Sequence, residues 1–266
     1  MALFTIQMES RFLQGNTTVS VVMPDLPLQE TEPARWYSQS GKFPVLWLLH
    51  GTSGDHSDYI RKTSLERYVW GKNLVVVMPS GLNSDYQNWP GFATGLSMED
   101  FLLQELIPMV QSWLPVSTRP EDNFIAGLSM GGRGALMLGL RHPEYFGAIG
   151  SMSFVPYRLE HDRQAPVLPV QRMENVIANA GGWQEYCASD YNLWDRLQER
   201  SRQGSLMPIY LSMGDRDFYY PYWKEFEQHP AAENPNVYRR LVHGYGHEWP
   251  FWDQELPRLI EFFLKK

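Results

Sequence analysis

The stretch that decides the fold is FIAGLSMGGRGAL, residues 124–136. An apolar run comes first, the pattern G-x-S-x-G follows at Gly127, Ser129 and Gly131, and small residues continue after it. This order predicts a strand, a tight turn and a helix, with the serine Oγ exposed over the edge of a sheet. The two glycines let the strand and the helix pass closely. Since roughly one chain in ten of this length contains G-x-S-x-G by chance, the flanking strand and helix carry the inference.

Two short apolar runs indicate central strands, at residues 45–49 and 74–78, and further strands are expected at residues 146–150, 208–213 and 237–242. Continuous apolar runs of this length suit parallel strands that are buried on both faces. Alternating residues 3–23 predict two or three further strands. Helices are expected over residues 57–70, over 97–114 with Ser97 as a cap and a kink at Pro108, over 132–140 and over 254–265. Together with the serine turn, this alternation predicts an α/β-hydrolase fold with a mostly parallel sheet flanked by helices.

One domain over residues 1–266 is expected, because nothing in the sequence marks a linker. Residues 154–204 lack a convincing strand and contain several prolines and the pair Gly181-Gly182. A structureless loop of that length would be unusual in a compact domain. We therefore expect a partly helical insertion, or cap, that precedes the strand bearing the acid and covers the active site.

Composition excludes several classes of function. The net charge of −7, with scattered Lys and Arg, argues against nucleic acids and anionic membranes as partners. The first residues lack the basic and apolar regions of a signal peptide, and no apolar run is long enough to span a bilayer. The single cysteine, Cys187, suits a reducing compartment, so a cytoplasmic protein is expected.

The general base is expected after the serine and after an acid in the chain. His247 stands in HGYGHEW, residues 243–249, directly after the last expected strand. A loop at the carboxyl end of a strand can bring an imidazole to a serine that follows a neighbouring strand. His243 is the competing candidate, but it sits closer to the strand. A zinc pair formed by both histidines would need a helix, and the intervening glycines disfavour one.

The acid is expected in LSMGDRDF, residues 211–218, where two aspartates follow a strand. A buried carboxylate there would hold the imidazole in its productive tautomer. Spacing alone does not separate Asp215 from Asp217.

Two backbone donors are needed for the oxyanion of a tetrahedral intermediate. One is expected at Met130, the residue after the nucleophile. The other is expected in the turn HGTSGDH, residues 50–56, at Thr52, with Gly51 as the alternative. His50 is expected to brace this turn.

Four segments together resemble the esterase D-type branch of the α/β-hydrolases. They are residues 45–54, 127–132, 214–218 and 246–249, and they look most similar to bacterial tributyrin or acetyl esterases. The resemblance implies Asp217, before an aromatic residue, as the triad acid. It also implies short-chain acyl esters as substrates, sometimes acetylated sugars or hydroxycinnamoyl esters, with no metal or organic cofactor, and often an oligomer.

The sequence departs from one group in that branch. S-formylglutathione hydrolases carry a cysteine in the oxyanion loop, whereas this chain has Thr52-Ser53-Gly54. Aromatic residues are candidates for an acyl or aryl pocket, with core packing as the alternative: Tyr86, Trp89, Phe92, Trp183 and Trp194.

The sequence therefore predicts a serine carboxylesterase that acts on small-molecule esters through an acyl-enzyme on Ser129. An acyltransferase or a thioesterase would use the same triad. A non-catalytic binding protein with this fold is the alternative from another class.

Overall fold

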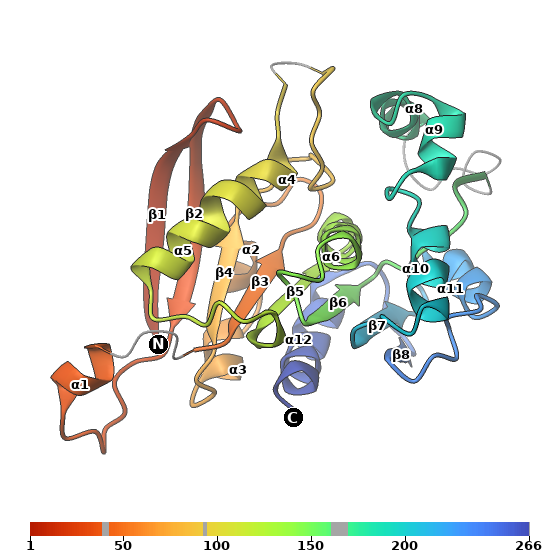
Figure 1. Cartoon of the computed structure of the whole chain (residues 1–266). Coiled ribbons are helices and arrows are strands. Elements are labelled where there is room, and N and C mark those ends of the chain that lie inside the picture. The colour runs from red at the N-terminus through yellow and green to blue at the C-terminus, as the bar shows by residue number, and fades with distance from the viewer. Residues whose placement is uncertain (39–42, 93–94, 161–169, 266) are drawn as a thin grey trace.

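Eight strands form one sheet in the part of the chain that the structure, a computed structural model, describes: residues 1–38, 43–92, 95–160 and 170–265 (Figure 1). They are β1 (Ala2–Ser10), β2 (Gly15–Met23), β3 (Val45–Leu49), β4 (Val75–Pro79), β5 (Asn123–Leu128), β6 (Ala148–Met152), β7 (Ile209–Gly214) and β8 (Val237–Val242). The order is β1-β2-β4-β3-β5-β6-β7-β8. Strand β2 is antiparallel to both of its neighbours, β1 and β4, and all other neighbouring strands are parallel. The mostly parallel sheet predicted from the sequence is confirmed.

The central strands are buried on both faces, which explains the continuous apolar sequences of β3 and β4. Every residue of β3, β4, β5, β6 and β7 is buried. Side chains that alternate along the strands enter two separate apolar cores, one on each face. Helices must therefore cover both faces of the sheet.

The helices are α1 (Pro33–Ser38), α2 (Asp58–Lys62), α3 (Leu65–Val69), α4 (Met98–Asp100), α5 (Ile107–Trp113), α6 (Met130–Arg141), α8 (Val170–Asn179), α9 (Trp183–Ala188), α10 (Leu193–Arg202), α11 (Tyr220–Phe226) and α12 (Trp249–Leu264), with a π-helical turn at Phe101–Leu106 and a 3₁₀ turn at Pro120–Asp122. Helices α5, α6, α10 and α11 contribute to one core. Helices α2, α3 and α12 contribute to the other. Figure 1 shows α5 and α6 in front of the strands, with α12 behind them.

Two helix predictions need correction. The helix expected over residues 57–70 is two short helices, because Thr63 is extended and its hydroxyl accepts the N–H of Leu65. Ser97 does not cap the next helix through its side chain, whose hydroxyl donates to the carbonyl of Gly95 instead. The distortion expected at Pro108 takes the form of a π-helical turn just before it.

The segment between β6 and β7 holds α8, α9 and α10. Its helices have a small apolar cluster of their own, in which Leu159, Met173, Val176 and Tyr186 are buried. Figure 1 shows α8 and α9 standing away from the sheet. This cluster explains how α8 and α9 are stable although they contribute nothing to the two main cores.

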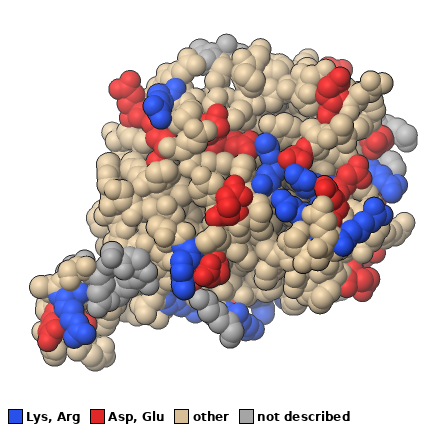
Figure 2. All heavy atoms as spheres, viewed as in Figure 1, with Lys and Arg blue, Asp and Glu red and all other residues tan. Residues whose placement is uncertain are grey.

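The described surface carries mixed charges. Lys and Arg lie beside Asp and Glu on the face drawn in Figure 2, and basic residues do not form a separate patch there. Among the residues described, none of the helices has the length and apolar character required to cross a membrane.

Candidate active site

Ser129 occupies the sharp turn between β5 and α6. Its backbone has φ 52° and ψ −117°, a conformation that costs energy for any residue other than glycine. The Ser129 N–H donates to the carbonyl of Met152 at 2.9 Å, which ties the turn to β6. A Cβ on Gly127 would lie 2.6 Å from the Leu49 carbonyl oxygen and would also strike the backbone of Gly131. The two glycines of the motif are therefore required by close backbone approach.

His247 and Asp217 complete a chain of hydrogen bonds with Ser129. The Nε2 atom of His247 lies 2.9 Å from Ser129 Oγ, and Nδ1 lies 2.9 Å and 3.1 Å from the two carboxylate oxygens of Asp217. The Asp217 side chain is fully buried, and its Oδ1 also accepts the N–H of Tyr219 at 2.9 Å. The carboxylate thus fixes Nδ1 as the donor and leaves Nε2 facing the serine as an acceptor.

Aromatic rings enclose the His247 imidazole. Phe218 and Tyr219 lie 4.2 Å and 5.8 Å away between ring centroids, and Trp252 meets the imidazole edge-on at 5.1 Å. The Trp252 indole is itself fixed, because its Nε1 donates to Ser153 Oγ at 2.9 Å. The fixed Trp252 ring limits the orientations that the imidazole can adopt.

The competing acid and base form a separate pair. Asp215 Oδ2 lies 2.9 Å from His243 Nδ1, and its Oδ1 accepts the N–H of Gly244. These two hydrogen bonds lower the pKa of Asp215 below its ordinary value. The His243 side chain is 84% exposed. Because both carboxylate oxygens are engaged away from His247, Asp215 is poorly placed to orient that imidazole.

The turn at residues 50–56 lies against the nucleophile. A Cβ on Gly51 would lie 3.5 Å from Ser129 Cβ, so the backbone of this turn approaches the serine closely. His50 is buried, and its Nε2 accepts the N–H of Gly81 at 2.7 Å. Its Nδ1 must then carry the proton and donate to the carbonyl of Gly51, also at 2.7 Å. Burial lowers the pKa of His50, which keeps this neutral tautomer in place.

The other oxyanion candidate, Met130, is the first residue of α6. The first N–H groups of a helix have no partner within it, so the Met130 N–H is available to a ligand at Ser129.

A cavity of about 510 Å³ contains Ser129 and His247. Its lining includes residues 51–53 and four aromatic side chains, with Lys62 and Arg172 among the remaining residues: Phe218, Tyr219, Trp249 and Trp252. The described residues hold no cluster of three His, Cys, Asp or Glu side chains suited to a metal ion. Because aromatic side chains line the cavity, it can hold a small molecule with an apolar part next to the serine.

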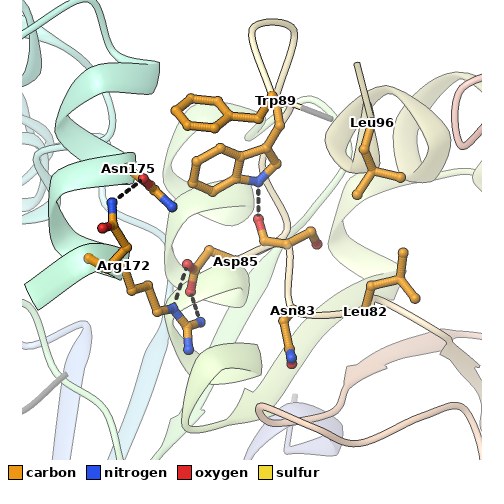
Figure 3. A pocket seen from close by; sticks show the side chains of 10 residues that line it. Leu82, Asn83, Asp85, Trp89, Leu96, Arg172 and Asn175 are labelled. Atoms are coloured by element: carbon orange, nitrogen blue, oxygen red, sulfur yellow. Dashed lines mark hydrogen bonds and ion pairs between the residues drawn. The ribbon is translucent and has the colours of Figure 1, made fainter. Parts of the chain in front are cut away.

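A second hollow of about 530 Å³ lies beside the first, and Arg172 lines both (Figure 3). Trp89 and Phe92, two of the aromatic residues considered from the sequence, line this second hollow. The Trp89 indole Nε1 donates to the carbonyl of Ser84, which fixes the ring (Figure 3).

The structure places the other three aromatic candidates outside both cavities. Tyr86 is fully buried, and its hydroxyl donates to the carbonyl of His50 at 3.0 Å. Trp194 is buried edge-on against His229. Trp183 stacks on Tyr186 within the insertion. Core packing, the alternative considered from the sequence, accounts for Tyr86 and Trp194.

Sequence reasoning missed several residues that line the catalytic cavity. Phe218, Trp249 and Trp252 each lie within five residues of Asp217 or His247, so chain proximity could have indicated them. Arg172 lies in the insertion, where no motif or periodicity could have indicated it.

Comparisons with known proteins identify the family and the fold of this chain. The chain is 26% identical over 272 residues to an acetyl esterase of Caldicellulosiruptor saccharolyticus, covering 100% of this chain and 99% of that protein. Two solved Staphylococcus aureus structures are similar. One is FphF, a fluorophosphonate-binding serine hydrolase, with 24% identity, a TM-score of 0.82, and 100% of this chain and 99% of that chain covered. The other is an S-formylglutathione hydrolase, with 23% identity, a TM-score of 0.80 and 98% of each chain covered.

These structural likenesses show that the chain has the α/β-hydrolase fold, as the sequence predicted. The family model Esterase, described as "Putative esterase", matches residues 15–263. That match spans nearly the whole sheet and every residue of the hydrogen-bonded chain at Ser129. The chain therefore belongs to the Esterase family.

Proposed function

We propose that this protein is a serine carboxylesterase that hydrolyses short-chain acyl esters. The observation that carries the proposal is the hydrogen-bonded chain from Asp217 through His247 to Ser129, which opens on a cavity. In acylation, Ser129 Oγ attacks the ester carbonyl while His247 Nε2 takes the hydroxyl proton. The N–H groups of Met130 and Thr52 hold the negative oxygen of the tetrahedral intermediate. His247 then protonates the departing alcohol.

Deacylation repeats the same steps with water as the nucleophile. His247 removes a proton from water as it attacks the acyl carbonyl, the intermediate collapses, and Ser129 recovers its proton from the imidazole. The Asp217 carboxylate orients the imidazole and stabilises the imidazolium through its two contacts with Nδ1. The acyl group leaves as a carboxylic acid.

Small acyl groups suit the space at the serine. Phe218, Trp249 and Trp252 supply apolar walls, and the similar protein from Caldicellulosiruptor saccharolyticus is an acetyl esterase. The neighbouring hollow at Trp89 gives a longer or aromatic portion of the ester a place to lie. The insertion of residues 154–204 is proposed as the cap over the site, supported by the contribution of α8 to the cavity wall.

A substrate panel with a covalent probe tests the proposal. We expect turnover of p-nitrophenyl acetate and butyrate, and labelling of the wild-type serine by a fluorophosphonate. Acetyl to octanoyl esters, methyl ferulate and acetylated xylose would define the acyl and alcohol preferences. Ser129→Ala should lower kcat by roughly 10⁶ and abolish labelling, since the triad acts as a unit. A wild-type protein with neither turnover nor labelling would instead support the non-catalytic alternative.

Two other reactions use the same acyl-enzyme. Thioester hydrolysis is favoured by the likeness to an S-formylglutathione hydrolase and disfavoured by the absence of a cysteine from residues 50–56. Comparing S-formylglutathione with p-nitrophenyl esters separates the two. Acyl transfer would show as a new ester when an alcohol is added. A cytoplasmic location, supported by the single Cys187, and a homo-oligomer, supported by the family resemblance, complete the proposal.

A further inference from the structure

Arg172 reaches from the insertion to the turn at the active site. It lies on α8 (Val170–Asn179), and its Nη1 donates to Thr52 Oγ1 at 3.0 Å across 120 residues of sequence. Its Nε and Nη2 donate to the two carboxylate oxygens of Asp85, which Figure 3 shows facing the guanidinium. Three of the five N–H groups of this guanidinium are thereby committed to two fixed partners.

Asp85 is a firm anchor for the arginine. It is buried and has φ 52°, so the surrounding structure holds it in an uncommon conformation. Arg133, on α6, places its Nη1 3.5 Å from Asp85 Oδ1, one of the two oxygens that accept from Arg172. The guanidinium is thus held by a carboxylate that is itself tied to the helix following Ser129.

The turn that Arg172 contacts needs support from outside. The Gly54 N–H donates to the carbonyl of Gly51, which makes Thr52 and Ser53 the central residues of a four-residue turn. Ser53 has φ 62°, in a place where glycine or asparagine is normally found. Asn83 Oδ1 accepts the Ser53 N–H at 2.8 Å. Arg172 on Thr52 and Asn83 on Ser53 therefore hold the two central residues of the turn.

We infer that Arg172 is a positioning residue for the oxyanion hole, acting through the hydroxyl of Thr52. The inference rests on the proposed function, because it gives the Thr52 N–H a role in the reaction. The hydrogen bond from Nη1 fixes the Thr52 side chain, and with it the direction of the backbone donor. The oxyanion hole is then complete only when α8 is docked, so the insertion contributes to catalysis by holding the Thr52 side chain in place.

Two substitutions separate the effect of the hydrogen bond between Arg172 and Thr52 from that of the ion pair between Arg172 and Asp85. Arg172→Lys keeps a positive charge for Asp85, but an ammonium group cannot reproduce the guanidinium fork that reaches Asp85 and Thr52 together. Thr52→Val removes the acceptor and keeps the backbone N–H. Arg196→Lys is the matched control, because Arg196 also lies in the insertion, pairs with two carboxylates and is 20% exposed, compared with 19% for Arg172.

Activity is measured with p-nitrophenyl acetate and normalised to active serine by fluorophosphonate titration, so that a loss of folded protein does not count. We expect Arg172→Lys and Thr52→Val each to lower kcat by about 10- to 100-fold, less than complete removal of an oxyanion donor. KM should change by less than about threefold, because the contact acts in the transition state. The double variant should lose no more than the worse single variant. Arg196→Lys should stay within about twofold of wild type for both constants.

Inhibition by a trifluoromethyl ketone gives a second readout, since its adduct with Ser129 carries a negative oxygen in the hole. The inhibition constant should rise by the same factor as kcat/KM falls. Losses that multiply in the double variant, or a loss confined to KM, would overturn the inference and make Arg172 a substrate contact. A kcat for Arg172→Lys equal to that of the control would also overturn it. A wild-type protein without turnover or labelling would overturn the proposed function itself, and this inference with it.

Discussion

The Nε2 atom of His247 lies 2.9 Å from the Oγ atom of Ser129, although 118 residues separate them in the chain. The sheet explains the contact. Ser129 follows β5 and His247 follows β8, and these strands run parallel with β6 and β7 between them. Their carboxyl ends therefore meet at one edge, where the loop after β8 reaches back across the loop after β7. Asp217 lies in the loop after β7, where its carboxylate contacts Nδ1 of the imidazole while Nε2 faces Ser129.

The two aspartates after β7 should differ sharply in their effect on catalysis. Asp217→Asn removes the buried carboxylate that fixes the tautomer of His247, and we expect kcat to fall by about 10⁴. Asp215→Asn alters only the exposed contacts with His243 and Gly244, and kcat should change by less than about threefold. Steady-state kinetics on both purified variants measure this difference. Equal losses, or the reverse order, would reassign the triad acid.

The glycine before the nucleophile should be essential for folding. An Ala Cβ at Gly127 would lie 2.6 Å from the Leu49 carbonyl oxygen and against the Gly131 backbone, neither of which has room to move. We expect Gly127→Ala to lower the free energy of unfolding by at least about 2 kcal/mol. Gly91→Ala is the control, since nothing lies within 4 Å of a Cβ there. Urea unfolding of both variants tests this, and a Gly127→Ala protein as stable as the control would refute the steric argument.

The sequence predicted most of the sheet because burial on both faces leaves a strong local signal. The runs at β3 and β4 are continuously apolar for this reason. Local signals failed where a single side chain changed the backbone. The hydroxyl of Thr63 divides the helix expected over residues 57–70, and a threonine in a helical pattern gives no warning of that effect.

The hydrogen-bonded chain at Ser129 was predictable for a related reason. Each of its members follows a strand, so its place in the sheet could be inferred from strand order and loop position. Asp217 could be preferred to Asp215 only through resemblance, because both follow β7 within three residues and spacing alone does not separate them. Arg172 had no such signal, since it reaches Thr52 from a helix whose position depends on the tertiary structure.

Phe218 should affect binding of the acyl chain more than the chemistry. Its ring lines the catalytic cavity and is 51% exposed, so an alkyl chain can cover it. Phe218→Ala should raise KM for p-nitrophenyl butyrate by about fivefold, the equivalent of about 1 kcal/mol of lost apolar contact, and should raise KM for the acetate less. Trp113→Ala, which removes an exposed ring of α5 outside the cavity, is the control. A large fall in kcat with both esters would instead show that Phe218 mainly orients His247.

His142 should make stability depend on pH. It ends α6, where its Nε2 lies 2.7 Å from Glu99 Oε1 and its Nδ1 lies 3.1 Å from Glu144 Oε1. Burial alone would lower the pKa of His142, but the hydrogen bonds to these two carboxylates outweigh it and raise the pKa above its ordinary value of 6.5. The end of a helix also favours a positive charge. The folded state therefore binds the proton more tightly than the unfolded state does.

This stabilisation should be fully present below pH 6.5 and should be lost as the pH rises through the raised pKa of the folded state. His142→Gln removes the titrating group, so wild type should exceed the variant in free energy of unfolding by about 1–2 kcal/mol at pH 5.5 and by less at pH 8.5. Glu144→Gln, which leaves the contact with Glu99, should keep part of the pH dependence. Urea unfolding at both pH values measures the differences. An advantage for wild type that is equal or larger at pH 8.5 would mean that His142 stabilises the end of α6 as a neutral ring.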